Sequence, residues 1–333
     1  MTSGWSFQGE IVTSGGGTGR DNGADHVHRE ILREGCHALP MTGHSRTLFR
    51  CFLILAMAAL FIGVRSQAQN NPEWTEAFPP HQIAGNLYYV GSKDLAAYLV
   101  VTPQGTILIN SNLESSVPQI KASIEKLGFR FSDTKILLIS HAHYDHDAGS
   151  ATIKQLTGAK YMVMDADVPV VEDGGKSDFA YGKDKSNWYK PAKVDRVLHD
   201  GDKVELGGVG LVAHKTAGHT RGCTTWTMKV TGNGRTYDAV IIGSPNVNPG
   251  YRLVGKPSYP GIVADYEQTF RTLKSLHCDL FLGAHGGYYG MSSKYVRLKN
   301  GDKEAFVDSA GYTSYVAERE EAFRKELARQ QKQ

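Results

Sequence analysis

Apolar and polar positions follow strand-like and helix-like patterns from residue 70 onward. Short aromatic or β-branched runs bounded by glycine, proline or serine turns predict strands at 87–90, 97–101, 106–109, 136–139 and 161–164. Apolar residues recur at helical spacing from Val117 to Leu127, with Gly128 just past the end, and this pattern predicts a helix. A second helix is predicted through 152–156.

The second half repeats this pattern. Strands are predicted at 203–206, 209–213, 224–230, 238–242 and 279–282, and helices around Tyr266–Leu276 and at 313–329. Two β-rich halves, each with helices on one side, predict an α/β fold in one domain: a four-layer αββα sandwich. Residues 171–191 show no clear period, and we interpret them as a long surface loop bordering a cleft.

The amino-terminal part differs from the rest. Residues 1–40 show no periodicity, and we expect a disordered or non-native extension there. Residues 41–68 combine Arg46 and Arg50, an apolar run and the ending Ser66-Gln67-Ala68, which is typical of a secretory signal peptide. The run is shorter than the ~20 residues that span a bilayer, so a retained anchor is the weaker interpretation. We expect Met41 to be the true start, and residues 69–333 to form the mature domain in the periplasm.

Charge and cysteines narrow the picture. The net charge of +3 over 333 residues, without a basic stripe, argues against nucleic-acid binding. Cys36 and Cys51 fall in the amino-terminal part, which leaves Cys223 and Cys278. In an exported protein these two either pair or remain buried thiols, and the sequence does not choose between the alternatives.

One stretch carries the chemistry: His141-Ala142-His143-Tyr144-Asp145-His146, directly after the apolar run 136–139. Imidazole nitrogens with a carboxylate suit a borderline divalent ion such as zinc, and a buried strand would deliver them at its carboxyl end. The alternative, a polar loop that is merely rich in histidine, requires four ligand-type residues in register by chance. The stretch therefore predicts a metal site.

Two further histidines follow predicted strands. His219 lies in Ala217-Gly218-His219-Thr220, and His285 lies in Gly283-Ala284-His285-Gly286-Gly287. Glycines on both turns let the backbone approach closely, so we expect both side chains to complete the metal site. The alternative is that each is a histidine satisfied by hydrogen bonds in a turn. The other histidines beyond residue 70 lack this setting and are interpreted as structural or surface groups: His81, His199, His214 and His277.

These motifs together resemble the metallo-β-lactamase superfamily from about Pro72 to the end of the chain. Residues 86–91 and 218–226 are similar to the zinc β-lactamases of subclass B3. The resemblance implies an αββα sandwich with two zinc ions at the sheet edge. It assigns His141, His143 and His219 to the first zinc. It assigns Asp145, His146 and His285 to the second.

The end of the strand at 238–242 separates related families. Thioesterases and lactonases of this fold place a metal-bridging aspartate there, and other β-lactamase subclasses place a cysteine ligand there. This chain has Gly243-Ser244-Pro245 instead. Cys223 is therefore interpreted as structural. The Ser-x-Ser common in the subclass is replaced by Ser244-Pro245-Asn246-Val247-Asn248, in which Ser244, Asn246 and Asn248 are the candidate substrate-binding residues.

The resemblance implies a monomeric, secreted β-lactamase that acts on penicillins, cephalosporins and carbapenems and confers antibiotic resistance. A metal-bound hydroxide would attack the β-lactam carbonyl, with Asp145 as the catalytic residue that orients it. One alternative is another exported hydrolase of this fold, a lactonase or thioesterase. A non-catalytic zinc-binding member is a further alternative.

Overall fold

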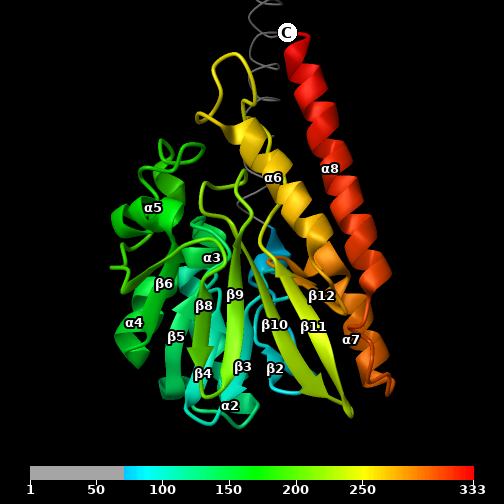
Figure 1. Cartoon of the computed structure of the whole chain (residues 1–333). Coiled ribbons are helices and arrows are strands. Elements are labelled where there is room, and N and C mark those ends of the chain that lie inside the picture. The colour runs from blue at the N-terminus through cyan, green and yellow to red at the C-terminus, as the bar shows by residue number, and fades with distance from the viewer. Residues whose placement is uncertain (1–70) are drawn as a thin grey trace, which may run out of the picture. The chain divides into compact units, whose positions relative to one another are not determined.

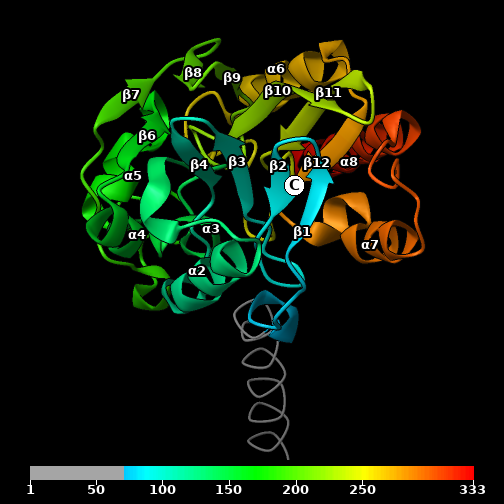
Figure 2. The ribbon, with the colours of Figure 1, turned by 90° about the horizontal axis from the view of Figure 1, so that it is seen from below.

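Two β-sheets lie face to face, and helices cover their outer sides (Figures 1 and 2). The computed structural model describes residues 71–333. The predicted extension at 1–40 and the signal peptide at 41–68 lie outside the described residues. In Figure 2 the layers follow one another from α6, through β10 and β11, to β3 and β4, and then to α2. This is the predicted αββα arrangement, so the fold prediction is confirmed.

The first sheet has seven strands in sequence order. They are β1 (His81–Ala84), β2 (Leu87–Tyr89), β3 (Tyr98–Thr102), β4 (Gly105–Ile109), β5 (Thr134–Leu138), β6 (Lys160–Met164) and β7 (Arg196–Leu198). β1 to β4 pair antiparallel, whereas β4 to β7 pair parallel. The carboxyl ends of the parallel strands therefore meet at one edge of the sheet.

The second sheet has five strands in the order β12-β11-β10-β9-β8. They are β8 (Lys203–Leu206), β9 (Val209–Lys215), β10 (Thr224–Gly232), β11 (Arg235–Ile242) and β12 (Leu280–Gly283). β11 and β12 pair parallel and the rest antiparallel. The helices are α2 (Val117–Lys126), α3 (Tyr144–Asp147), α4 (Ser150–Thr157), α5 (Val168–Asp173), α6 (Ile262–Ser275), α7 (Met291–Lys299) and α8 (Ser309–Gln331).

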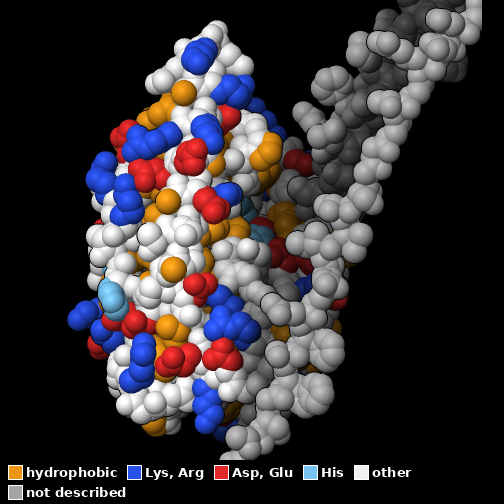
Figure 3. Space-filling model, turned by 90° about the vertical axis from the view of Figure 1, so that its right-hand side faces the viewer, with side chains coloured by type: hydrophobic (Ala, Val, Ile, Leu, Met, Phe, Trp, Pro, Cys, Tyr) orange, Lys and Arg blue, Asp and Glu red, His pale blue; other side chains and the backbone are white. Residues whose placement is uncertain are grey.

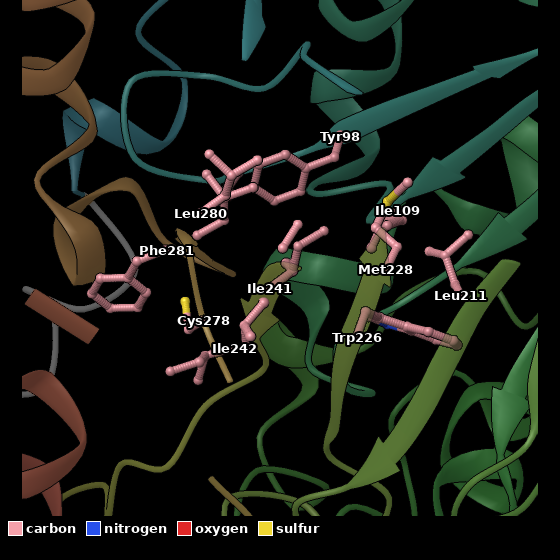
Figure 4. Packing of buried hydrophobic residues seen from close by; sticks show 14 of the residues in the cluster. Tyr98, Ile109, Leu211, Trp226, Met228, Ile241, Ile242, Cys278, Leu280 and Phe281 are labelled. Carbon is pink, nitrogen blue, oxygen red and sulfur yellow. The ribbon is translucent and has the colours of Figure 1, made fainter. Parts of the chain in front are cut away.

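Alternate residues of the central strands point into two different cores. Ile107 and Ile109 of β4 pack between the sheets, whereas Leu108 packs under the outer helices with Ile120 and Ile124 of α2. Strands buried on both faces read as continuous apolar runs, which explains why β4 and β5 were predictable. Figure 4 shows part of the core between the sheets, in which Ile241 lies between Leu280 on one side and Trp226 on the other.

The hydrophobic pattern did not predict several short or polar elements. β1 and β7 have only four and three residues, and α7 has two buried positions, so none produces a readable period. The loop predicted at 171–191 is wrong at its start, because α5 extends to Asp173 and Val171 is fully buried. Pro169 at the first turn of α5 is compatible with a helix start, where its missing N–H costs nothing.

The described residues also bear on the cysteines and the surface. Cys223 and Cys278 are free and buried, which answers the question that the sequence left open. On the face shown in Figure 3, acidic and basic side chains are interspersed. Ion pairs one helical turn apart on α8 include Glu320–Arg324 and Glu321–Lys325. No helix within residues 71–333 has the length and apolarity needed to cross a membrane.

Candidate metal centre

Three loops bring the predicted ligands to one edge of the sandwich. The loop after β5 carries His141 and His143, and α3, which follows it, carries Asp145 and His146. The turn between β9 and β10 carries His219, and the segment after β12 carries His285. The ends of β5 and β12 lie at the same edge of the sandwich, because His146 Nε2 lies 3.1 Å from His285 Nε2. Residues separated by up to 144 positions therefore share one site.

The first group of candidate ligands consists of His141, His143 and His219. One nitrogen of each ring lies within 4.8 Å of a nitrogen of the other two, and all three side chains are buried. His141 Nε2 is buried without a hydrogen-bond partner among the described residues. A buried polar atom of this kind is costly unless something satisfies it, so the donor set fits a divalent metal.

The second group consists of Asp145, His146 and His285. His146 Nε2 lies 3.1 Å from His285 Nε2 and 3.2 Å from Asp145 Oδ2, and His285 Nε2 lies 3.6 Å from the same oxygen. Ligands at 2.0–2.1 Å from a tetrahedral zinc would lie roughly 3.3 Å apart. The three atoms thus form a triangle of the size that one zinc ion requires.

Most ring nitrogens on the far side of these histidines are fixed by the protein. His219 Nδ1 donates to the main-chain oxygen of Asn246 at 2.9 Å, and His285 Nδ1 donates to Asp94 Oδ2 at 2.9 Å. His143 Nε2 lies 3.5 Å from Asp178 Oδ2, an ion-pair distance. Such outer contacts select the tautomer and orient the ring.

The pKa shifts favour metal-binding protonation states at four of these groups, since burial also lowers the pKa of His146. Burial, together with the neighbouring His143, lowers the pKa of His219 to about 3, and burial with His146 lowers that of His141 well below its usual range. Burial alone would raise the pKa of Asp145, but the imidazoles of His146 and His285 hold it well below the usual range of a carboxyl. Neutral imidazoles and ionised carboxylates are the forms that bind a metal.

A buried carboxylate joins two of the ligand loops. Asp167, just after β6, accepts hydrogen bonds from Ala142 N at 3.0 Å, Thr220 Oγ1 at 2.8 Å and Gly222 N at 2.7 Å. A Cβ at residue 222 would lie 2.6–2.7 Å from Asp167, so only glycine fits. Asp167 therefore holds the loop of His141 and His143 against the turn of His219.

Sequence reasoning missed Asp94, Asp167 and Asp178. Asp167 had one usable signal, since it follows a buried parallel strand at the same edge as His141. Asp178 lies in the aperiodic segment that was expected to border a cleft, and its contact with His143 agrees with that expectation. Asp94 lies in the turn between the antiparallel strands β2 and β3 and had no such signal.

The three candidate substrate-binding residues lie together beside tyrosine hydroxyls. Asn246 Nδ2 donates to Tyr288 Oη at 2.8 Å, and Ser244 Oγ lies 3.1 Å from the same hydroxyl. Asn248 Nδ2 donates to Tyr181 Oη at 2.8 Å. Much of their hydrogen-bonding capacity is thus used within the protein, and their role toward a substrate stays a prediction.

The end of β11 is built without an acidic side chain. A Cβ at Gly243 would lie 2.5 Å from Thr224 O and 2.8 Å from Cys223 Sγ, so the backbone approaches too closely for any larger residue. Cys223 Sγ also accepts a hydrogen bond from Ser244 N at 3.1 Å. A bridging carboxylate cannot replace Gly243 in this packing.

The remaining histidines beyond residue 70 have other surroundings. His81 is buried among aromatic rings, including that of Tyr89 at 5.3 Å, and burial lowers its pKa to about 4. His199 and His277 have mostly exposed side chains. His214 pairs with Thr227 Oγ1 on β10. None belongs to either group of ligands.

Comparison with known proteins agrees with this geometry. Residues 95–285 match the model of the metallo-beta-lactamase superfamily. The native FEZ-1 metallo-beta-lactamase of Legionella gormanii is 59% identical over 77% of this chain and 98% of its own, with a TM-score of 0.76. BJP-1, a subclass B3 metallo-beta-lactamase of Bradyrhizobium japonicum, is 38% identical over 78% of this chain and 97% of its own, with a TM-score of 0.73.

A more distant relative is a probable metallo-hydrolase of Burkholderia pseudomallei, which is 27% identical over 166 residues. The chain spans about half of the length of that curated relative, 53%. The match to the family model covers more than half of this chain, and the FEZ-1 enzyme is matched over nearly its whole length. On these grounds the chain is a member of the metallo-β-lactamase superfamily.

Proposed function

We propose that this protein is a zinc-dependent β-lactamase that hydrolyses the cyclic amide of penicillins, cephalosporins and carbapenems and so confers antibiotic resistance. The observation that carries the proposal is the pair of three-donor groups at one sheet edge, with Asp145, His146 and His285 spaced for one zinc ion. The 59% identity to a metallo-beta-lactamase supports the same reaction class.

Two zinc ions would be held by different groups of side chains. His141, His143 and His219 would hold the first, and Asp145, His146 and His285 the second. A similar structure at 39% identity is described as a di-zinc class B3 enzyme, which supports two ions. Three protein ligands per ion leave coordination positions open, as catalytic rather than structural zinc sites do.

Bound zinc would supply a nucleophile from water and stabilise the negative charge that develops as the amide opens. The rest of the chemistry belongs to the chain. The ionised Asp145 carboxylate accepts a hydrogen bond from the attacking water and orients it toward the carbonyl carbon. Tyr181 and Tyr251 pack against His143 and His219 at 5.0 and 6.1 Å between ring centroids and limit the access of bulk water.

The geometry gives no support to a lactonase or thioesterase in which a carboxylate at the end of β11 bridges two metals. Gly243 occupies that position, and its Cβ site is blocked by Thr224 and Cys223. Such an activity is therefore kept as an outcome of the test rather than as a second proposal.

The test is the hydrolysis of nitrocefin and imipenem by purified, zinc-loaded protein, with and without a chelator. N-acyl-homoserine lactone and S-lactoylglutathione are assayed beside them. We expect chelator-sensitive turnover of both β-lactams. If both are untouched while a lactone or thioester is cleaved in a chelator-sensitive way, the β-lactamase proposal is wrong.

Export belongs to the same proposal, since β-lactams act on the cell wall. Cleavage after Ala68 would release a periplasmic monomer that begins near Gln69, without a membrane anchor. Amino-terminal sequencing of the protein recovered from periplasmic extract tests the cleavage, and light scattering of the same material tests the monomer. A membrane-bound product that retains residues 41–68 would contradict the cleavage.

A further inference from the structure

We propose that Asp94 is a positioning residue for the second metal, and that the segment 71–77, here called the amino-terminal segment, holds Asp94 in place. The inference rests on the proposed function only in that the second group of ligands binds zinc. According to this proposal, the amino-terminal segment is part of the metal centre although it carries no metal ligand.

The contact with His285 is the first step. Asp94 Oδ2 accepts the hydrogen bond from His285 Nδ1 at 2.9 Å, and both side chains are only 15% exposed. Because a carboxylate can only accept, the proton must sit on Nδ1. His285 Nε2 is then left with its lone pair directed at Asp145 and His146, where the metal would lie.

Asp94 is itself held from several directions. Its Oδ2 also accepts from Trp74 Nε1 at 3.2 Å, and its Oδ1 accepts from Gly287 N at 3.1 Å. Its main-chain oxygen accepts from Gly286 N at 2.6 Å. These bonds join the turn after β2 to the loop after β12, so that the carboxylate and the imidazole keep a constant relation to each other.

The amino-terminal segment closes this arrangement from outside. Glu73 O accepts hydrogen bonds from Asp94 N at 3.1 Å and from Ser92 Oγ at 3.2 Å, and Glu76 O accepts from Lys93 N at 2.9 Å. The Trp74 ring packs 6.1 Å from the ring of His285 and 6.0 Å from that of Tyr144. The amino-terminal segment therefore supports the second group in two ways. It holds Asp94, whose carboxylate binds His285, and it packs the Trp74 indole against the His285 ring.

The first group of ligands receives no such support from this part of the chain. Its outer contacts come from Ser140, Asp178 and the main chain of Asn246. A defect in Asp94 or Trp74 should therefore weaken one metal position and spare the other. That selectivity distinguishes a positioning role from a general loss of stability.

The experiment measures stepwise zinc binding by competition with a chromophoric chelator, using the full purified chain and the variants Asp94→Ala, Asp94→Asn and Trp74→Phe. We expect the dissociation constant of the weakened zinc to rise about 10- to 100-fold in Asp94→Ala, as for other outer partners of metal-bound histidines. The single side-chain oxygen of asparagine can accept from His285 but not also from both Trp74 and Gly287. The zinc dissociation constant of Asp94→Asn should therefore lie between those of Asp94→Ala and the wild type. The other zinc should stay within about twofold.

Glu76→Gln is the matched control. Glu76 lies on the same amino-terminal segment, and the substitution removes its ion pair with Lys93 without changing any contact of the Asp94 carboxylate. Cobalt substitution gives a spectroscopic readout of which position is affected. Unchanged binding of both metals in all three variants overturns the proposal, as does equal weakening of both metals or an equal effect of Glu76→Gln. If Asp94→Ala does not fold, Asp94→Asn and Trp74→Phe still decide.

The zinc measurement needs no substrate. Failure of the wild-type protein to hydrolyse β-lactams would overturn the proposed reaction and leave this inference standing. Conversely, normal β-lactam turnover with no selective zinc defect would overturn this inference alone.

Discussion

The metal centre and the site of Lys294 are two places where this protein buries ionisable groups, and they differ in how those groups are paired. Lys294 is 5% exposed, and its Nζ lies 2.9 Å from Asp308 Oδ2 and faces the rings of Phe281 and Tyr289 at 5.2 and 5.5 Å. The cation thus meets an anion and two aromatic faces. Every charge there has an opposite within the chain.

At the metal centre, atoms of the same character face one another instead. Two imidazole nitrogens and a carboxylate oxygen that can all accept lie within 3.1–3.6 Å, and His141 Nε2 is buried without a partner in the described part of the chain. Buried acceptors of this kind cost stability unless a cation satisfies them. A buried charge that is paired within the chain adds to stability. Several buried acceptors that face one another instead favour the binding of a cation.

The largest expected effect is that of Asp145→Asn at the metal centre. Asparagine is neutral, and it loses both the ligand charge and the group that orients water. We expect kcat/KM for nitrocefin to fall by about 10²- to 10⁴-fold, while the zinc content falls less. Elemental analysis beside turnover measures both quantities. Full activity in this variant would remove Asp145 from its proposed role.

Asp308→Asn should give the opposite result, a loss of stability with little loss of activity. Asparagine can still cap α8 at Gly311 N, where Asp308 accepts at 2.9 Å, but the Lys294 ammonium loses its anion. We expect a loss of about 3 kcal/mol in the free energy of unfolding by urea. The double variant with Lys294→Met should recover much of it. A loss below about 1 kcal/mol would show that the pair is not what stabilises this region.

Asp167→Asn tests a residue that combines features of both regions. Its buried carboxylate is satisfied by donors of the protein, as the Lys294 charge is satisfied by Asp308, but it also holds together two loops of the metal centre. The amide would turn a donor toward one of Ala142, Thr220 or Gly222. We expect a loss of about 1–3 kcal/mol in stability and weaker binding of the first zinc. Thr220→Val, which removes one donor, should have a smaller effect on both. Zinc binding unchanged by Asp167→Asn would place Asp167 with the purely structural groups.

The smallest effect concerns pH. Burial would raise the pKa of Asp308, but its hydrogen bonds with Lys294 and Gly311 N lower it overall. A carboxyl with a lowered folded-state pKa contributes stability above its unfolded pKa of about 4 and loses it as the pH falls through the folded value. The stability difference between wild type and Asp308→Asn should therefore shrink below pH 4. Urea unfolding of zinc-free protein at pH 7, 5 and 3 measures it, and a difference that grows on acidification would contradict this sign.

The sequence predicted which side chains would gather at the candidate metal centre because most of them follow buried strands. The runs before His141 and His285 are apolar on both faces, as parallel strands are, and side chains just past such strands gather at one edge. Four of the six predicted ligands also lie within six consecutive residues. Local pattern therefore predicted the strands and the loops that carry the candidate ligands.

Only the tertiary structure decided which residues support those ligands. Asp94 meets His285 across 191 positions of sequence, and Asp167 meets Gly222 across 55. Neither carboxylate is distinguished by its neighbours in the chain, because its role depends on which loops the strand order brings together. Periodicity reports how a residue faces its own strand or helix, whereas a hydrogen bond between distant loops depends on the packing of the whole sandwich.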